Sequence, residues 1–270
     1  MMAGPFELSG RVAIITGGAG LLGISHARAI HSAGGIPVLL DIAAPAAEEL
    51  RARAGFDVHC EVCDITREEQ LQNALTSVLL RYGRVDILIN NAANNPKVEA
   101  PGGLNHTRLE SFPLEHWEAD LAVGLTGAML CSRVFGAEMA RRGKGVIVNI
   151  ASDLALIAPD QRLYAIEGRR QDEQPVKPVS YSVVKTGLIG LTRYLATYWA
   201  GSGVRANALC PGGVQNGQDE VFLHRIAERI PMGRMAAIDE YQGAILFLSS
   251  DASSYMTGAV LAIDGGRTSW

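Results

Sequence analysis

The sequence predicts an α/β fold in which helices cover both faces of a doubly wound parallel sheet, and three observations support this prediction. Short apolar runs alternate with longer amphipathic stretches along the whole chain. The short runs are apolar throughout, as in parallel strands that are buried on both faces. No linker, repeat or low-complexity tract divides the 270 residues, so we expect a single domain over residues 1–270.

The predicted elements follow one another in a regular order. In the first half we expect strands at 11–16, 36–41, 57–62 and 85–90, with helices between them that reach residue 33 and span 45–54 and 67–82. In the second half we expect strands at 145–151, 204–209 and 259–264, and helices at 115–142, from 181 onward, at 219–230 and at 239–249. Ligands of such sheets bind at the carboxyl ends of the strands, so functional residues should lie there.

The composition excludes several classes of function. Hydrophobic residues make up 48% of the chain and charged residues 19%, which is typical of a globular protein with a large core. A net charge of −4 and a pI near 5.9 give no basic surface for nucleic acid or for an anionic membrane. We find no apolar run of 18 or more residues and no signal-peptide layout in residues 1–10, so we expect a cytoplasmic protein without membrane or nucleic-acid partners.

A glycine-rich loop follows the first predicted strand. Gly18, Gly20 and Gly23 form a G-x-G-x-x-G pattern at the start of a helix. Glycines there let the backbone approach a pyrophosphate, whose charge the helix N-terminus receives. The alternative is a glycine-rich turn without a ligand.

Two acidic residues end the next two strands. Asp41 lies 18 residues after Gly23, where a carboxylate accepts hydrogen bonds from the ribose hydroxyls of adenosine and repels a 2′-phosphate. This predicts NAD rather than NADP as the cofactor. Asp64 is placed to hydrogen-bond the adenine, although an acid at the start of a helix, ahead of Thr66, explains it equally well.

A tyrosine and a lysine are four residues apart in the run YSVVK. In a helix, Tyr181 and Lys185 project from one face, one turn apart. A phenol with a pKa near ~10 becomes an acid–base group at neutral pH when a fixed cation favours its phenolate. The alternative is an exposed helix whose Tyr and Lys have no catalytic role.

The four cysteines give no metal or redox site. Cys60 and Cys63 form a lone C-x-x-C, but in a strand residues three apart face opposite sides. No second pair of ligands follows, and we predict no bound metal.

The chain resembles the short-chain dehydrogenase/reductase family along essentially its whole length. The motifs that carry the resemblance occur in the family's order: TGGAGLLG at 16–23, NNAA at 90–93, NIAS ending at Ser152, YSVVK at 181–185, Pro211-Gly212, and DASSYMTGAVLAIDGG at 251–266. The resemblance implies a Rossmann-type fold, a homotetramer or other homo-oligomer, and catalysis by Ser152, Tyr181 and Lys185. Ser152 would orient the reacting oxygen, and Lys185 would hold the nicotinamide ribose and lower the pKa of Tyr181. Together with the residue chemistry above, the resemblance implies that the cofactor contacts Gly17, Gly18, Gly20, Leu22, Gly23, Asp41, Ile42, Asp64, Ile65, Asn91, Ala92, Tyr181, Lys185 and Val214.

Three positions depart from the family's pattern. Leu21 replaces an expected glycine, so Gly20 should supply the close approach to the nucleotide. Gly124 occupies the position of a catalytic asparagine and has no side chain for a water relay. A glycine inside a helix costs roughly 0.5 to 1 kcal/mol relative to alanine, which suggests close packing or a kink there. Asn216 replaces the usual threonine after the Pro-Gly turn.

The largest departure is an insertion at 153–180. Ser152 and Tyr181 are 29 residues apart, whereas the family commonly has about a dozen residues between them. The insertion is rich in charged residues, and we expect Arg162, together with Lys97 after the fourth strand, to bind an anionic or polar substrate. The alternative is a charged flap or an oligomer contact. These features look most like a subset of the family linked to bacterial surface-sugar pathways, including nonulosonic acid synthesis.

The sequence therefore predicts an NAD-dependent oxidoreductase that interconverts a secondary alcohol and a ketone, on a sugar or a related polar substrate. One alternative is a sugar dehydratase or epimerase that retains its NAD. Another is a nucleotide-binding scaffold or sensor without turnover, and Gly124 favours it, whereas intact Ser152, Tyr181 and Lys185 oppose it.

Overall fold

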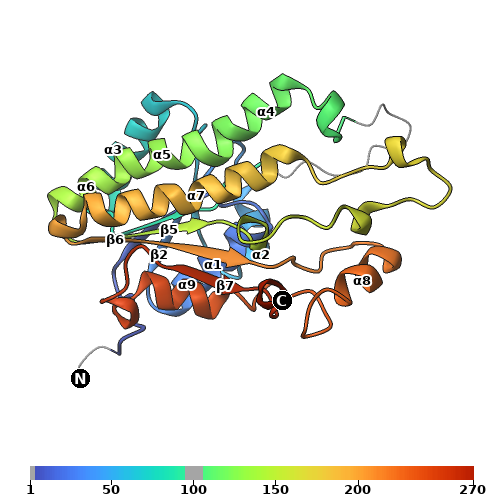
Figure 1. Cartoon of the computed structure of the whole chain (residues 1–270). Helices are drawn as coiled ribbons and strands as arrows, with labels where there is room; N and C mark the ends of the chain where they lie inside the picture. The colour runs from blue at the N-terminus through green and yellow to red at the C-terminus, as the bar shows by residue number, and fades with distance from the viewer. Residues whose placement is uncertain (1–3, 95–105) are drawn as a thin grey trace.

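The computed structural model describes residues 4–94 and 106–270, and one parallel sheet runs through them (Figure 1). Its seven strands lie in the order β3-β2-β1-β4-β5-β6-β7. Their bounds are β1 Val12–Thr16, β2 Ile36–Asp41, β3 His59–Val62, β4 Ile87–Asn90, β5 Gly145–Ile150, β6 Val204–Pro211 and β7 Val260–Ile263. This confirms the predicted fold class. The order reverses between β1 and β4, which opens a crevice for a ligand at their carboxyl ends.

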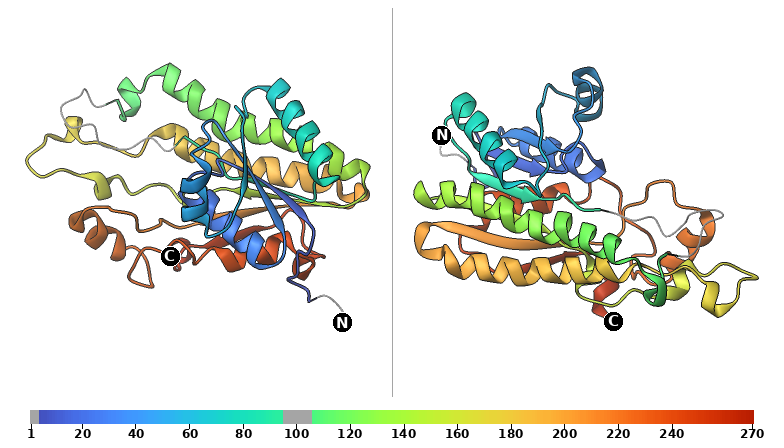
Figure 2. Two further views of the ribbon diagram at one scale, coloured as in Figure 1. Left: turned by 180° about the vertical axis from the view of Figure 1, so that it is seen from behind. Right: turned by 90° about the horizontal axis from the view of Figure 1, so that it is seen from above.

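Helices cover both faces of the sheet (Figure 2). In β1, Val12 and Ile14 pack into one core and Ala13 and Ile15 into the other, which is why the strand is apolar from Val12 to Ile15. The first core receives α3 Glu68–Tyr82, α5 Ala128–Cys131, α6 Ala137–Arg141 and α7 Val179–Tyr198. The second receives α1 Leu21–Ser32, α2 Ala47–Ala54 and α9 Gln242–Ser249.

The helix predicted at 115–142 is one continuous helical rod with two π-helical segments. It begins with α4 Leu114–Leu121, and π-helical turns at Ala122–Gly127 and Ser132–Gly136 separate α4, α5 and α6. The rod from Leu114 to Arg141 is long and apolar enough to cross a membrane, but 56% of its most apolar window is buried inside the protein. This is the burial expected of a core helix in a packed domain.

The insertion forms three short 3-10 turns rather than a long helix. They span Asp153–Ala155, Gln161–Tyr164 and Gln171–Glu173. The middle turn packs against α8 Glu220–Ala227, where Leu163 shares a small apolar cluster with Ile226, Ile230 and Met235. The insertion and α8 extend beyond the sheet on the same side of the molecule (Figure 1).

Candidate active site

The first turns of α7 carry the predicted acid–base pair. Pro178 precedes the helix, and its fixed φ makes it a suitable residue at a helix start. Tyr181 is half-buried, and the Lys185 ammonium lies 5.9 Å from the centre of its ring. Lys185 is 5% exposed, and its Nζ donates a hydrogen bond to the carbonyl of Ile150, at 2.7 Å. The structure thus brings both side chains to the carboxyl end of β5.

Ser152 reaches the same place from the end of β5. Its hydroxyl donates to Asp153 Oδ1 at 2.8 Å and accepts from the Leu154 N–H at 3.2 Å. A hydrogen bond between Ser152 and the Tyr181 phenol lowers the pKa of that phenol. The three predicted catalytic residues are therefore assembled in the structure.

Burial has the largest effect on the charges of this group. It raises the pKa of Tyr181, and it lowers the pKa of Lys185 to about 8. Desolvation outweighs the hydrogen bond from Ser152, while the Lys185 ammonium is directed to the Ile150 carbonyl. The role that the resemblance gives Lys185, to lower the pKa of Tyr181, stays a prediction.

A buried ion pair supports Ser152 from behind, and sequence reasoning missed it. Arg267 Nη1 lies 2.6 Å from Asp153 Oδ2, and both side chains are at most 10% exposed. Because Asp153 also accepts from Ser152, the C-terminal segment fixes the orientation of the serine hydroxyl. The only signal in the sequence was an acid directly after Ser152, with no pattern to show its partner 114 residues away.

The glycine loop has the geometry that a dinucleotide requires. A Cβ on Gly23 would lie 2.4 Å from the Gly17 carbonyl oxygen, and one on Gly18 would lie 2.7 Å from Leu39 Cβ. Gly20 precedes α1, whose first turn contains no acidic residue and no side-chain cap. A Cβ on Gly20 would meet only the Gly17 oxygen, at 3.2 Å, so packing is less restrictive at this position than at Gly18 or Gly23. The residues present fit a phosphate group at this helix N-terminus.

The other predicted cofactor residues of the first half surround this loop. Gly17 has a φ of +59° and lies so near Ala92 that a Cβ would be 2.9 Å from its Cα. Asn91 Nδ2 donates to the carbonyls of Thr16 and Gly17, which ties β4 to the loop. Leu22 is partly buried in the first turn of α1.

Asp41 lies at the end of β2, as predicted. Its Oδ2 accepts a hydrogen bond from the Ala19 N–H at 3.0 Å, so the carboxylate is fixed beside the glycine loop. Ile42 follows it and is 73% exposed. Arg53 of α2 donates to the Ala19 carbonyl, which places a guanidinium near the same loop. An acid and a base thus both adjoin the predicted adenosine site.

Asp64 has a local structural role in addition to the one predicted. Its Oδ1 accepts from the Thr66 hydroxyl at 2.7 Å and from the Thr66 N–H at 2.9 Å. The hydroxyl bond is the largest cause that holds the pKa of Asp64 below its usual value. Asp64 therefore stabilises the turn ahead of α3, whose N-cap residue is Arg67, and its contact with the adenine stays a prediction. Its neighbour Ile65 is buried, and Val214 follows β6 in a bridge with Ala236.

Of the two predicted substrate residues, Lys97 lies outside the described residues, and its role stays a prediction. Arg162 is exposed and forms a paired hydrogen bond with the Asp160 carboxylate, at 2.8 and 2.9 Å. Asp160 also pairs with Arg229, so it joins the insertion to the segment after α8. This pairing is the one that the charged-flap alternative describes, and the role of Arg162 in substrate binding stays a prediction.

Gly124 is closely packed, as its position in a helix suggested. It lies in the first π-helical segment, and a Cβ there would be 2.5 Å from Val184 Cγ1. A larger residue at this contact would require the Val184 side chain or α7 to shift.

The structure places Cys60 and Cys63 apart, as the strand pattern predicts. Cys63 packs into one core, whereas Cys60 packs against the other, so the two thiols lie on opposite faces of the sheet. Within residues 4–94 and 106–270, no cluster of three His, Cys, Asp or Glu side chains could hold a metal ion.

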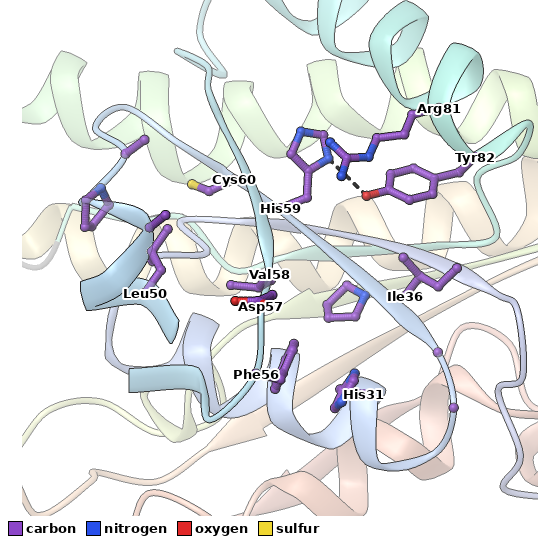
Figure 3. Close-up of a pocket in the computed structure, with 16 residues that line it drawn as sticks. His31, Ile36, Leu50, Phe56, Asp57, Val58, His59, Cys60, Arg81 and Tyr82 are labelled. Atoms are coloured by element: carbon purple, nitrogen blue, oxygen red, sulfur yellow. Dashed lines mark hydrogen bonds between the residues drawn. The ribbon is translucent and has the colours of Figure 1, made fainter. Parts of the chain in front are cut away.

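A cavity of about 670 Å³ lies at the outer edge of the sheet (Figure 3). His31 and Phe56 stack there with ring centres 3.8 Å apart, and the Tyr82 hydroxyl is 3.3 Å from His59 Nδ1. None of the predicted catalytic or cofactor residues lines this cavity. It is therefore separate from the site at the end of β5.

The comparisons with known proteins agree with this geometry. A family model described as short chain dehydrogenase matches residues 11–165, and one described as enoyl-(acyl carrier protein) reductase matches residues 170–268. The chain belongs to the short-chain dehydrogenase/reductase family and is an enzyme, an oxidoreductase. The predicted family is thus confirmed.

Individual relatives match over nearly the full length. The chain is 34% identical over 271 residues to D-threitol dehydrogenase of Mycolicibacterium smegmatis, a match that covers 97% of this chain and 95% of the relative. A gluconate 5-dehydrogenase of Burkholderia cenocepacia, solved with NADP and tartrate, has a TM-score of 0.82 and 30% identity over 98% of each chain. An NAD⁺-bound xylitol dehydrogenase has a TM-score of 0.81 and 26% identity, and covers 96% of this chain and 99% of its own. The narrower resemblance to the surface-sugar subset stays a prediction.

Proposed function

We propose that the protein is an NAD-dependent dehydrogenase that oxidises a secondary alcohol of a polyol or sugar acid to a ketone, or reduces the ketone. The observation that carries this proposal is the meeting of Ser152, Tyr181 and Lys185 at the carboxyl end of β5. This is the same edge of the sheet as the glycine loop after β1. A hydroxyl, a phenol and an ammonium so placed suit proton transfer to or from a substrate oxygen.

In the oxidation, the chain's own residues handle the proton. The bound nicotinamide supplies the hydride acceptor. The phenolate of Tyr181 takes the hydroxyl proton of the substrate, while the Ser152 hydroxyl hydrogen-bonds the same oxygen. Asp153 and Arg267 keep the Ser152 side chain in position. Burial raises the pKa of Tyr181, and the ammonium of Lys185, one helical turn away, is a positive charge that would favour the phenolate.

The cofactor preference rests on Asp41. Its carboxylate is fixed beside the glycine loop, where it would accept hydrogen bonds from ribose hydroxyls and repel a 2′-phosphate. Arg53 adjoins the same loop and would attract a 2′-phosphate, so Asp41 has to dominate for NAD to be preferred. Solved relatives include both an NAD⁺ complex and an NADP complex.

The substrate class rests on the relatives, whose names point to polyols and sugar acids. The test is a panel of threitol, xylitol, gluconate and related compounds, each with NAD and with NADP, followed by the absorbance of the reduced cofactor. We expect a kcat/KM of about 10⁴ M⁻¹s⁻¹ or more for at least one compound with NAD. If the folded protein binds NADH but no compound is oxidised, this substrate class is wrong.

We further propose a cytoplasmic homo-oligomer, built through the α4–α6 rod, α7 and β7. Tyr194 and Tyr198 of α7 support it, because they are 61% and 62% exposed and stack with ring centres 5.5 Å apart. Light scattering at micromolar concentration should give a dimer or tetramer, and Tyr198→Asp should reduce the mass. A monomeric wild-type protein would contradict this assembly.

A further inference from the structure

A second lysine lies closer to the proposed acid–base tyrosine than Lys185 does. The Lys177 ammonium is 3.9 Å from the centre of the Tyr181 ring, whereas that of Lys185 is 5.9 Å from it. Both distances are within the range of about 6 Å at which a cation is attracted to an aromatic face. Lys177 belongs to the insertion, so the insertion contributes a charge directly to the proposed site.

The backbone on either side of Lys177 is anchored. Its N–H donates to Gln161 Oε1 at 2.8 Å, and the N–H of Val176 donates to Thr107 Oγ1 at 3.1 Å. Pro178 follows and fixes φ at the start of α7. These contacts fix the backbone of Lys177, from which its side chain extends over the Tyr181 ring.

The ammonium of Lys177 differs from the neighbouring arginines of the insertion. Arg162 and Arg170 each form paired hydrogen bonds with a carboxylate, to Asp160 and Asp172. Lys177 Nζ forms no ion pair and no hydrogen bond with any residue of 4–94 or 106–270. Within that part of the chain its charge is left to act on the Tyr181 ring.

The charges around Lys177 come from three elements. Asp153, after β5, and Asp120, on α4, favour its ammonium, while burial lowers its pKa to about 8. Lys185, on α7, is near enough that Lys177 lowers its pKa in turn. The half-buried position is thus costly for a cation, and two acids partly offset the cost.

Neither acid is a contact partner of Lys177. Asp153 pairs with Arg267 and accepts from Ser152, and Asp120 accepts from the Ser180 hydroxyl. The acids therefore favour the ammonium at a distance without neutralising it in a close ion pair.

We propose that Lys177 is a positioning residue for the proton-transfer step, whose ammonium over the Tyr181 ring favours the phenolate that accepts the substrate proton. This inference rests on the proposed function. Lys177 keeps its own proton throughout: the hydroxyl proton of the substrate passes to the Tyr181 oxygen alone. Gly124 of the α4–α6 rod supplies no side chain where it lies against Val184 of α7, and the polar contact of the rod near Tyr181 is Asp120, which accepts from the Ser180 hydroxyl.

The pH range of this effect follows from the same contacts. The pKa of Lys177 is lowered to about 8, so its charge is present at neutral pH and is lost as the pH rises through that value. Lys177 therefore stabilises the Tyr181 phenolate most below about pH 8. Tyr164 also adjoins Tyr181, and burial raises its pKa to about 12, so it stays neutral across this range.

The first test measures the Tyr181 phenol without any substrate. Tyrosinate absorbance is titrated in the wild type, in Lys177→Met and in Lys177→Arg, each against the same protein carrying Tyr181→Phe, so that the difference isolates one tyrosine. Lys177 loses its charge near pH 8, below the raised pKa of Tyr181, so the wild type and Lys177→Met should give the same Tyr181 titration. Lys177→Arg stays charged and should lower the pKa of Tyr181 by about one unit, a tenfold change in the phenolate fraction. Lys144→Met is the matched control, because Lys144 is exposed and pairs with Asp251 at the surface.

The second test uses the pH profile of kcat/KM in the oxidation direction. At pH 7, where Lys177 is charged, kcat/KM should be about tenfold lower in Lys177→Met, and the two proteins should converge as the pH rises above about 8. A wild-type kcat/KM at pH 7 in a folded Lys177→Met protein, or an unchanged pKa of Tyr181 in Lys177→Arg, would overturn the inference. A rise in KM at every pH, without convergence at high pH, would instead assign Lys177 to substrate binding and also overturn it. If Tyr181→Phe alone retains activity, the proposed function fails, whatever the Lys177 variants do.

Discussion

The nucleotide side and the substrate side of this molecule are constructed differently. On the nucleotide side, the backbone passes so near its neighbours that a Cβ on Gly18 or Gly23 would lie within 2.7 Å of another atom. On the substrate side, charged side chains of the insertion decide the arrangement: Arg162 pairs with Asp160, whereas Lys177 lies over Tyr181. A close backbone contact of this kind permits only glycine, and the glycine can be recognised in the sequence. An ion pair does not specify its partner, so the pairing cannot be predicted from the sequence.

The largest effect should come from the nucleotide loop. Gly23→Ala places a Cβ 2.4 Å from the Gly17 oxygen, which forces the loop to move. We expect NAD affinity to fall at least about a hundredfold and the Tm to fall by several degrees, because a close contact is lost and strain is added. Isothermal titration and thermal unfolding measure the two quantities.

Gly20→Ala is the matched control for that loop. Its Cβ would meet only the Gly17 oxygen at 3.2 Å, so the Tm should change little. If Gly20 supplies the close approach to the nucleotide, NAD affinity should still fall about tenfold. Wild-type NAD affinity in Gly20→Ala would show that the approach is made elsewhere.

A smaller effect should follow from the charge of Asp41. Asp41→Asn keeps an oxygen that accepts from the Ala19 N–H but removes the negative charge. We expect the ratio of kcat/KM for NAD over NADP to fall about tenfold or more, since a like-charge clash with the 2′-phosphate is relieved. An unchanged ratio would mean that Asp41 does not set the cofactor preference.

The smallest effect should come from Arg162. Its partner Asp160 retains Arg229 when Arg162 is removed, so Arg162→Ala should change KM by less than about twofold. A tenfold rise in KM would restore Arg162 as a substrate-binding residue. Hydrogen bonds from Arg162 hold the pKa of Asp160 far below its usual value. The ion pairs of Asp160 therefore persist at mildly acid pH and are lost only as the pH falls through the lowered pKa of its carboxyl group.

The fold could be predicted from the sequence because strands buried on both faces are recognisable. The apolar run at β1 sends Val12 and Ala13 into opposite cores, so a polar residue at either position would be buried at a cost. For Gly124 the sequence predicts only close packing or a kink, because the neighbour it packs against, Val184, lies on another helix. Tertiary contacts of this kind leave little periodic signal.

The site could be predicted only where its residues lie close in sequence or in a motif. Tyr181 and Lys185 are one helical turn apart, and their spacing fixes their common face. Asp153 and Arg267 form an ion pair between distant segments, and nothing in either segment specifies the other. The position of Lys177 depends on the path of the insertion, which the sequence alone does not determine.

The most direct test of the central claim is the kcat of Tyr181→Phe. The substitution removes one transferable proton and leaves the half-buried ring in place. With a substrate from the panel, we expect kcat to fall by about 10² to 10⁴, the usual contribution of an acid–base group. NADH affinity, followed by fluorescence, should stay within about twofold of the wild type. A kcat near the wild-type value, with intact NADH binding, would contradict the assignment of Tyr181 as the acid–base residue.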